Sequence, residues 1–318
     1  MGFQSLLGND RLKENIANAV KSGKAAHFYL ISGPEGSGKH TLATLLAAAL
    51  QCQRGGDKPC LTCPACRKVL SGTHPDFITI DDPEKKIVPV ALIRNMRQDM
   101  FLKPNEGNKK IYLLPRAQDM EDPSQNALLK ILEEPPSYGV FLLLTTNSAK
   151  LLPTVRSRCV ELKMSPLSQQ ALKNALLEKF PQADEDTLSA AMARSGGYLG
   201  QAVKLMDDGA TLYPETQKFL DAYGRKDPMA LMQTFIPMER YKRDKLIPIL
   251  QQWTQVLQQA LVCRSGGDVL LPQARALSGQ RNSQDLLRSV NELQKSIEYA
   301  QGNVSPAAIC GHLTWALR

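Results

Sequence analysis

Four cysteines lie close together near the start of this 318-residue chain, and their type and spacing could hold a metal ion. They are Cys52, Cys60, Cys63 and Cys66, and two residues separate Cys60 from Cys63 and Cys63 from Cys66. Two-residue gaps let neighbouring thiolates face one tetrahedral ion, and four thiolates leave no open coordination position. The spacing therefore predicts a structural zinc site with one ion per chain, in a module of about residues 52–66. A zinc ribbon that contacts DNA is the alternative.

A glycine-rich segment earlier in the chain has the pattern G-x-x-x-x-G-K of loops that bind phosphate. It follows an apolar run and precedes a stretch rich in alanine and leucine. In this context the glycines let backbone N–H groups turn toward phosphate oxygens, and the N-terminus of the following helix attracts the anion. Lys39 would reach the terminal phosphates of ATP or ADP. The candidate phosphate-binding residues are Gly33, Gly36, Ser37, Gly38, Lys39, His40 and Thr41.

The sequence departs from a hydrolysing phosphate loop in two places. His40 stands where a Ser or Thr hydroxyl holds Mg²⁺, and Thr41 lies about 100° further around the helix. The strand expected at Lys110–Leu114 ends in Pro115-Arg116, where carboxylates would be needed for Mg²⁺ and for the attacking water. The alternative strand, Phe77–Asp82, does end in two carboxylates. The residues therefore predict impaired metal positioning and leave binding of ATP or ADP open.

The composition is that of a globular protein with a basic balance. Hydrophobic residues make up 43% and charged residues 22%, which excludes a disordered or low-complexity chain. The net charge of +8 is spread along the chain, so a solvated surface explains it as well as contact with nucleic acid. No apolar run approaches the roughly 18 residues of a membrane helix, and the N-terminus lacks the pattern of a signal peptide. We therefore expect a cytoplasmic protein that makes no membrane contact.

Strand and helix signals alternate in the first half of the chain. The expected strands are Phe28–Ile31, Phe77–Ile80, Lys110–Leu114 and Val140–Thr145. The expected helices are Asp10–Lys21, Lys39–Leu50, Val90–Phe101 and Ser124–Glu133. This alternation indicates an α/β fold with a parallel sheet, in which the glycine-rich loop joins the first strand to a helix.

Beyond about Lys163 the strand signals disappear. Short helices are expected at Ser168–Phe180, Asp184–Ser195 and Leu199–Met206, followed by helix-period segments that include Asp244–Cys263 and Ser283–Ala300. The layout predicts three domains: an α/β domain at 1–164, a small helical domain at 165–210 and a larger helical domain at 211–318.

Three further segments carry a family resemblance: Asn126–Pro136, Thr145-Thr146-Asn147 and Val155–Cys159. With the phosphate loop and the cysteine cluster, they make the sequence resemble the bacterial clamp-loader subunits of the AAA+ class. Specific motifs cover about residues 1–210, whereas the remainder matches only in helical character and position. The resemblance implies an AAA+ P-loop parallel-sheet domain with a zinc insertion, a small helical lid domain and an all-α C-terminal collar domain for oligomerisation.

The family contains motor subunits, called gamma or tau, and a non-hydrolysing subunit, delta-prime. The resemblance implies that Gly200 stands where a motor carries the arginine that senses the γ-phosphate. With His40 and Pro115-Arg116, this favours a delta-prime-like stator of the DNA polymerase III clamp loader. Its expected partners are the motor (gamma/tau) and delta subunits, with the sliding clamp and primed DNA reached through the complex. An ATP-hydrolysing motor subunit and a stand-alone zinc-containing DNA-binding protein are the alternatives.

Arg158 lies in Ser157-Arg158-Cys159, which matches the family's Ser-Arg-Cys motif. The resemblance implies that Arg158 acts as an arginine finger in trans, stabilising the transferring phosphoryl group in the neighbouring subunit's ATP site. A surface or salt-bridged arginine is the alternative. The adjacent Glu133 and Glu134 would point about 100° apart on a helix. They are therefore expected to end that helix rather than to act as an acid–base pair.

Overall fold

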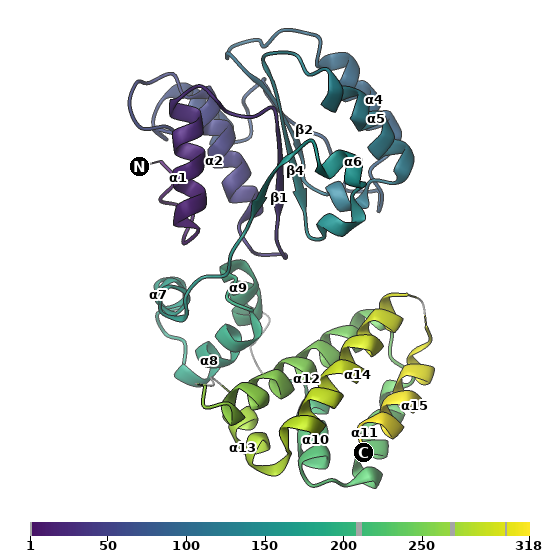
Figure 1. Ribbon diagram of the computed structural model, residues 1–318. Coiled ribbons are helices and arrows are strands. Elements are labelled where there is room, and N and C mark those ends of the chain that lie inside the picture. The colour runs from purple at the N-terminus through teal and green to yellow at the C-terminus, as the bar shows by residue number, and fades with distance from the viewer. Residues whose placement is uncertain (1, 208–211, 268–270, 303) are drawn as a thin grey trace. The chain divides into compact units, whose positions relative to one another are not determined.

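A parallel five-stranded sheet organises the N-terminal part of the computed structural model, which describes residues 2–207, 212–267, 271–302 and 304–318 (Figure 1). The strands are β1 (Phe28–Ser32), β2 (Phe77–Thr79), β3 (Lys110–Leu114), β4 (Gly139–Thr145) and β5 (Val160–Lys163). They lie in the order β2-β3-β4-β1-β5, and each neighbouring pair is parallel. One strand, β4, therefore separates β1, which leads into the glycine-rich loop, from β3.

The three central strands, β1, β3 and β4, are buried along their whole length, as their apolar sequences predict for a covered parallel sheet. The Phe141 ring of β4 stacks between Phe28 and Tyr112, with centroid distances of 4.8 and 5.1 Å. The edge strand β5 was not predicted. Its sequence, Val-Glu-Leu-Lys, is mostly exposed and contains no apolar run that would mark a strand.

Helices cover both faces of the sheet (Figure 1). One face is covered by α1 (Asp10–Lys21), α2 (Lys39–Gln51) and α3 (Pro64–Leu70). The other is covered by α4 (Val90–Asp99), α5 (Asp122–Glu133) and α6 (Pro153–Arg156). The predicted strands and long helices of this part lie within two residues of their expected bounds, whereas the short α3 and α6 were not predicted. The α/β class with a parallel sheet is confirmed.

The elements after β5 are helices throughout the described residues. They are α7 (Gln169–Lys179), α8 (Glu185–Arg194), α9 (Leu199–Asp207), α10 (Pro214–Gly224), α11 (Pro228–Met238), α12 (Arg243–Arg264), α13 (Pro272–Gln280), α14 (Ser283–Gln301) and α15 (Pro306–Ala316). The chain forms two compact units: Met1–Leu172 with Tyr198–Gln201, and Lys173–Gly197 with Ala202–Arg318. The predicted boundary between 210 and 211 lies outside the described residues, and the division into three domains stays a prediction.

The core of the second unit is built around α12, which packs against α10, α13 and α14. Trp253 of α12 is fully buried and stacks on Phe219 of α10 at a centroid distance of 4.0 Å. The Trp253 indole N–H donates to Thr216 Oγ1 at 3.0 Å, so the polar atom of this large side chain is satisfied. In the described parts of the chain, no helix is both long and apolar enough to span a membrane.

Candidate phosphate-binding and metal sites

The glycine-rich loop joins β1 to α2, which is the context that its sequence predicted. The Gly33 N–H donates to the carbonyl of Thr145 at 3.1 Å, which ties the start of the loop to the end of β4. Gly36 and Gly38 have φ values of 69° and 89°, a backbone conformation that residues other than glycine rarely adopt. The structure therefore brings Gly33, Gly36, Ser37, Gly38, Lys39, His40 and Thr41 together as one loop and the first turn of α2.

The Lys39 side chain is folded back onto its own loop. Its ammonium group donates to the carbonyl oxygens of Gly33 at 2.6 Å and Pro34 at 2.7 Å, and only 8% of the residue is exposed. Burial lowers the pKa of Lys39, and the nearby carboxylate of Glu35 partly offsets this. The ammonium group of Lys39 is therefore bound by backbone carbonyls of its own loop. A bound phosphate would have to compete with these carbonyls for it.

The position of the Mg²⁺-binding hydroxyl is taken by His40. Loss of solvent lowers the pKa of His40, the charge of Lys39 lowers it further, and Asp81 acts in the opposite direction. The imidazole is therefore neutral at pH 7, and it offers no oxygen ligand for Mg²⁺. Thr41 is exposed on the surface of α2.

The end of β3 is followed by a positively charged side chain, Arg116, which is paired with a carboxylate. The Arg116 guanidinium donates to Asp81 Oδ1 through Nη2 at 2.6 Å and through Nε at 3.0 Å. It also donates to the carbonyl oxygens of Asp82 at 2.8 Å and Lys85 at 3.0 Å. Asp81 is one of the two carboxylates after β2 that were the alternative metal ligands, and it is paired with Arg116. In addition, β2 is an edge strand, separated from β1 by β3 and β4.

Arg158 lies just after α6, close to the end of α5. Its Nη1 donates to the Thr154 carbonyl at 3.0 Å, and its Nη2 lies 3.3 Å from Glu133 Oε1. The side chains of Arg158 and Glu133 are 40% and 56% exposed, so the guanidinium is accessible to another molecule. Glu133 does end α5, as expected, and its contact with Arg158 was not predicted. Burial raises the pKa of the adjacent Cys159 thiol to about 12, which fits a packing role.

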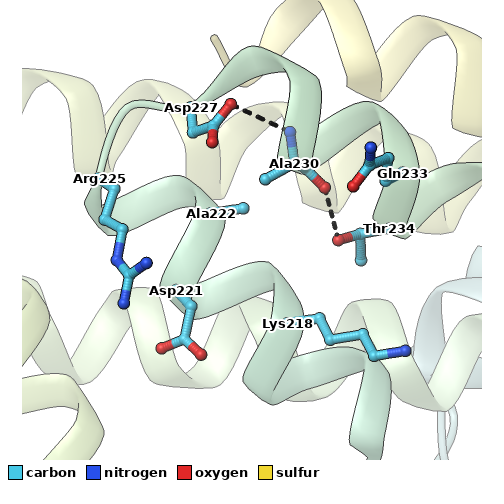
Figure 2. Close-up of a pocket in the computed structure, with 8 residues that line it drawn as sticks. All are labelled: Lys218, Asp221, Ala222, Arg225, Asp227, Ala230, Gln233 and Thr234. Atoms are coloured by element: carbon cyan, nitrogen blue, oxygen red, sulfur yellow. Dashed lines mark hydrogen bonds between the residues drawn. The ribbon is translucent and has the colours of Figure 1, made fainter.

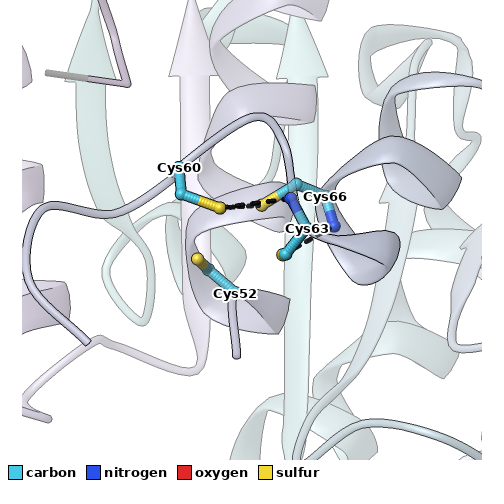
Figure 3. A group of neighbouring side chains, drawn as sticks. All are labelled: Cys52, Cys60, Cys63 and Cys66. Atoms are coloured by element: carbon cyan, nitrogen blue, oxygen red, sulfur yellow. Dashed lines mark hydrogen bonds between the residues drawn. The ribbon is translucent and has the colours of Figure 1, made fainter. Parts of the chain in front are cut away.

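The four clustered cysteines come from the end of α2, the following loop and the start of α3 (Figure 3). Their sulfur atoms all lie within 4.8 Å of one another, and all seven cysteines of the chain are free thiols. A tetrahedral zinc ion with Zn–S bonds of about 2.3 Å needs sulfur atoms about 3.8 Å apart. Cys52, Cys60, Cys63 and Cys66 therefore form a group that could hold one such ion.

Backbone N–H groups around this cluster favour thiolates. The Cys63 N–H donates to Cys60 Sγ at 3.3 Å, and the Cys66 N–H donates to Cys63 Sγ at 3.5 Å. The N–H groups of Thr62 and Cys63 lower the pKa of Cys60 to about 5, whereas burial raises the pKa of Cys66. Such N–H···S bonds orient metal ligands and tune their charge, so the surroundings of the cluster suit a metal centre.

The second unit contains a hollow of about 340 Å³ between α10 and α11 that sequence reasoning missed (Figure 2). Its lining residues are Lys218, Asp221, Ala222, Arg225, Asp227, Ala230, Gln233 and Thr234. The Asp227 carboxylate accepts the N–H groups of Met229 and Ala230 and so caps α11. The remaining charges are of both signs and come from residues scattered over ordinary helix surface. No sequence motif marks them, and we assign no chemistry to this hollow.

The outer side of α11 is apolar and exposed. Met229, Met232 and Ile236 are 64%, 48% and 50% exposed, and their spacing places them on one side of the helix. Leu231 and Phe235 lie on an adjoining side of the helix and are buried in the core. A helix that is apolar on both sides is typical of one whose outer side contacts a partner.

Comparison with known proteins places these features in a family. The family described as "DNA polymerase III, delta subunit" matches residues 8–168. The gamma subunit of DNA polymerase III from Buchnera aphidicola (subsp. Schizaphis graminum) is 30% identical over 270 residues, 80% of this chain and 74% of that protein. The delta' subunit from Pseudomonas aeruginosa is 32% identical over 235 residues, 72% of this chain and 69% of that protein.

A further relative is the tau subunit of DNA polymerase III from Bacillus subtilis, which is 30% identical over 225 residues. The match spans 69% of this chain but only 40% of the tau subunit. Relatives of all three types therefore lie at similar identity, and identity alone does not choose among them.

Proposed function

Because this chain belongs to the DNA polymerase III clamp-loader family of AAA+ proteins, we propose that it is a cytoplasmic, non-hydrolysing subunit of the delta-prime type. The observation that carries this proposal is Arg116 at the end of β3, with its guanidinium bound to Asp81 at 2.6 Å. A cation at this point cannot hold Mg²⁺ or accept a proton from the attacking water. The imidazole of His40 cannot supply the missing hydroxyl either.

A motor subunit of the gamma or tau type is the second candidate. The intact G-x-x-x-x-G-K pattern and the gamma and tau relatives favour it. His40, Arg116 and Gly200 oppose it, because each removes a different group that hydrolysis requires.

The test is steady-state ATP hydrolysis by the purified full chain with Mg²⁺. We expect a rate far below the enzyme median of about 10 s⁻¹, and no further loss in Lys39→Ala. Turnover near that median, abolished by Lys39→Ala, would establish the motor function and refute the proposal. A matched assay on a gamma subunit from the same preparation conditions checks that the buffer supports hydrolysis.

The role of the subunit in the complex is to complete a neighbour's site. Arg158 is accessible, and within the described part of the chain its ion pair is with an exposed carboxylate, Glu133, which a phosphate group could displace. We propose that Arg158 reaches the ATP site of an adjacent gamma or tau subunit and stabilises charge on the transferring phosphoryl group. The sliding clamp and primed DNA are then engaged through the assembled complex, which also contains the delta subunit.

The cysteine cluster is proposed to hold one structural zinc ion. Four sulfur ligands leave no open position for water or substrate, so the ion would fix the loop between α2 and α3 and take no part in catalysis. The ion would also stay with the subunit whether or not nucleotide is bound.

The helices α10–α15 are proposed to form the oligomerisation collar. The exposed residues Met229, Met232 and Ile236 support this, since a neighbouring subunit would cover apolar surface that is otherwise left in water. A collar of this kind holds the subunits together independently of the phosphate loop.

A further inference from the structure

We infer that the N-terminal segment Gly2–Leu6 couples the cysteine module, residues 52–66, to the phosphate loop. One end of the segment contacts the module and the other end contacts the loop, so a change in the cysteine cluster alters how firmly the tip of the loop is held. All of these residues belong to the first compact unit. The identity of the metal, zinc, rests on the proposed function, whereas the contacts of the segment do not depend on it.

The first end of the segment lies directly against the cysteine module. A Cβ atom added at Gly2 would overlap the backbone carbonyl of Pro59, the residue before Cys60. Phe3 is 5% exposed and belongs to the same buried cluster as three of the four cysteines. Residues 53–58 of the module form neither helix nor strand and are mostly exposed. The position of Pro59 therefore depends on the cysteines on either side of this loop.

The other end of the segment reaches the phosphate loop. A Cβ atom added at Gly38 would lie 2.9 Å from Leu6 Cδ1, so the Leu6 side chain packs on the last glycine of the loop. The Leu6 carbonyl accepts the Lys13 ammonium of α1 at 3.0 Å. The Leu6 N–H donates to the Phe3 carbonyl at 3.2 Å, so a single turn joins the two ends of the segment. A displacement of Phe3 is therefore transmitted to Leu6 and to the contact with Gly38.

The helix α2 also connects the two sites, because it begins at Lys39 and is followed by Cys52. Nine of its 13 residues are buried, so its own core holds the helix in place when the module loosens. The N-terminal segment is instead held mainly by two buried side chains, Phe3 and Leu6. An element with so few buried contacts opens at a lower free energy than the core around it. Loss of the cluster is therefore expected to displace the segment before it disturbs α2.

The test is amide hydrogen exchange of the full chain, measured with zinc bound and after removal of zinc by a chelator, with the zinc content of each sample determined. We expect exchange in residues 2–8 and 33–42 to be at least about 10-fold faster without zinc. Exchange in β3, which is buried in the sheet, should stay the same. Unchanged exchange in residues 2–8 or 33–42 on loss of zinc would overturn the inference. Faster exchange throughout the unit, β3 included, would overturn it as well, because the metal would then hold the whole unit.

A glycine variant tests the coupling independently of the metal. Gly2→Ala is expected to lift the segment off Pro59, so exchange in residues 33–42 should become faster although all four cysteines are intact. The matched control is Gly55→Ala in the module, where an added Cβ meets no atom within 4 Å, and its exchange should equal that of wild type. Equal exchange in Gly2→Ala and Gly55→Ala would overturn the inference. A wild-type protein that binds no zinc would refute the proposed zinc site, and the two glycine variants would still decide the coupling.

Discussion

Arg116 links the end of β3 to the loop after the neighbouring strand β2. Its guanidinium joins the end of β3 to the loop after β2 through Asp81 and the carbonyls of Asp82 and Lys85. About a quarter of each charged side chain in the Arg116–Asp81 pair is exposed, so solvent screens part of the attraction. The net effect is therefore expected to stabilise the first unit moderately.

We predict that Arg116→Ala lowers the free energy of unfolding of this unit by about 1–2 kcal/mol. Urea unfolding followed by circular dichroism measures it. The control is Lys85→Ala, which removes an exposed ion pair with Asp82 at 3.2 Å and is expected to cost about 0–1 kcal/mol. Equal losses in the two variants would mean that Arg116 is an ordinary surface arginine.

Asp76 is a buried acid whose charged form stabilises the first unit at neutral pH. Its carboxylate is fully buried and accepts the backbone N–H groups of Asn105, Glu106 and Gly107 at 2.6, 2.8 and 2.9 Å. Burial raises the pKa of Asp76, but the three N–H donors outweigh it, so the pKa lies below its ordinary value. The carboxylate therefore stays charged in the folded protein at pH values where it is protonated in the unfolded chain.

The sign of the pH effect follows from that lowered pKa. The stabilisation by Asp76 is present above the unfolded pKa of about 3.9 and is lost as the pH falls through the lower, folded value. We predict that Asp76→Asn is less stable than wild type at pH 7 and that the difference shrinks below about pH 4. Urea midpoints at a series of pH values test this, with Asp57→Asn, an exposed acid, as control. A difference that is constant with pH would contradict the assignment.

At the scale of elements, the segment between α2 and α3 depends on its four cysteines. We predict one zinc ion per chain by elemental analysis of protein purified without chelator. Cys63→Ser should lose the zinc and make residues 52–66 sensitive to protease, because the loop has little core of its own. Cys263→Ser is the control, since this isolated cysteine lies in α12 and should leave zinc content unchanged. Zinc-free wild type, or full zinc in Cys63→Ser, would disprove the site.

The second unit supplies an internal check on the zinc prediction. Its core is built from α10 to α15 around Trp253 and shares no buried residue with the cysteine cluster. Cys63→Ser should therefore leave its near-ultraviolet Trp signal in place. Loss of that signal would mean that the variant unfolds globally and that zinc does more than fix one loop.

The elements that the sequence predicted well are those with strong apolar patterns. The run Lys110–Leu114 is buried throughout and matches β3 residue for residue. In contrast, β5 is an exposed edge strand whose pairing with β1 depends on tertiary contacts, and α3 begins at a Pro in a loop set by the cysteines. Short elements of this kind carry little local signal, because their stability comes from the rest of the fold.

The candidate sites also differ in how far apart their residues lie in the sequence, and this decides whether the sequence could predict them. The loop from Gly33 to Thr41 and the cysteine cluster are each local in sequence, so spacing alone predicted that their residues would lie together. The contacts of Arg116 with Asp81, of Arg158 with Glu133 and of Gly200 with Gly36 join residues that are 35, 25 and 164 positions apart. No spacing rule connects such residues, and only the folded chain brings them together.

At the scale of the whole molecule, the exposed apolar side of α11 is the surface that we propose to bind a partner subunit. We predict that Met232→Glu prevents assembly with gamma and delta subunits, because a carboxylate buried at an apolar interface without a partner is costly. Gel filtration of mixed subunits measures it. The monomer should keep its stability, since Met232 is about half exposed. Gln233→Glu, on the same exposed turn, is the control, and assembly of Met232→Glu at wild-type level would place the interface elsewhere.

Arg158 should matter only when the complex is assembled. We predict that Arg158→Ala folds and assembles normally but lowers DNA- and clamp-stimulated ATP hydrolysis by the complex. The guanidinium is needed only where charge develops on a neighbour's phosphoryl oxygens, so its loss acts on the transition state and leaves assembly intact. Within the isolated chain it gives up an exposed contact with Glu133 at 3.3 Å, which contributes about 0–1 kcal/mol, and a hydrogen bond to the Thr154 carbonyl at 3.0 Å.

The loss of ATP hydrolysis in the complex depends on how many ATP sites use Arg158. An arginine finger is worth about 10³–10⁵-fold at the site that it serves, but one subunit of this type serves one neighbour, so total turnover should fall by that site's share. Arg156→Ala is the matched control, because it removes the same charge from an exposed position two residues away. Lys39→Ala should also have little effect, since under the proposed function the subunit's own site does not hydrolyse ATP. Equal hydrolysis by complexes containing Arg158→Ala and Arg156→Ala, with assembly verified by gel filtration, would mean that Arg158 is a surface arginine and that the subunit completes its neighbour's site by other means.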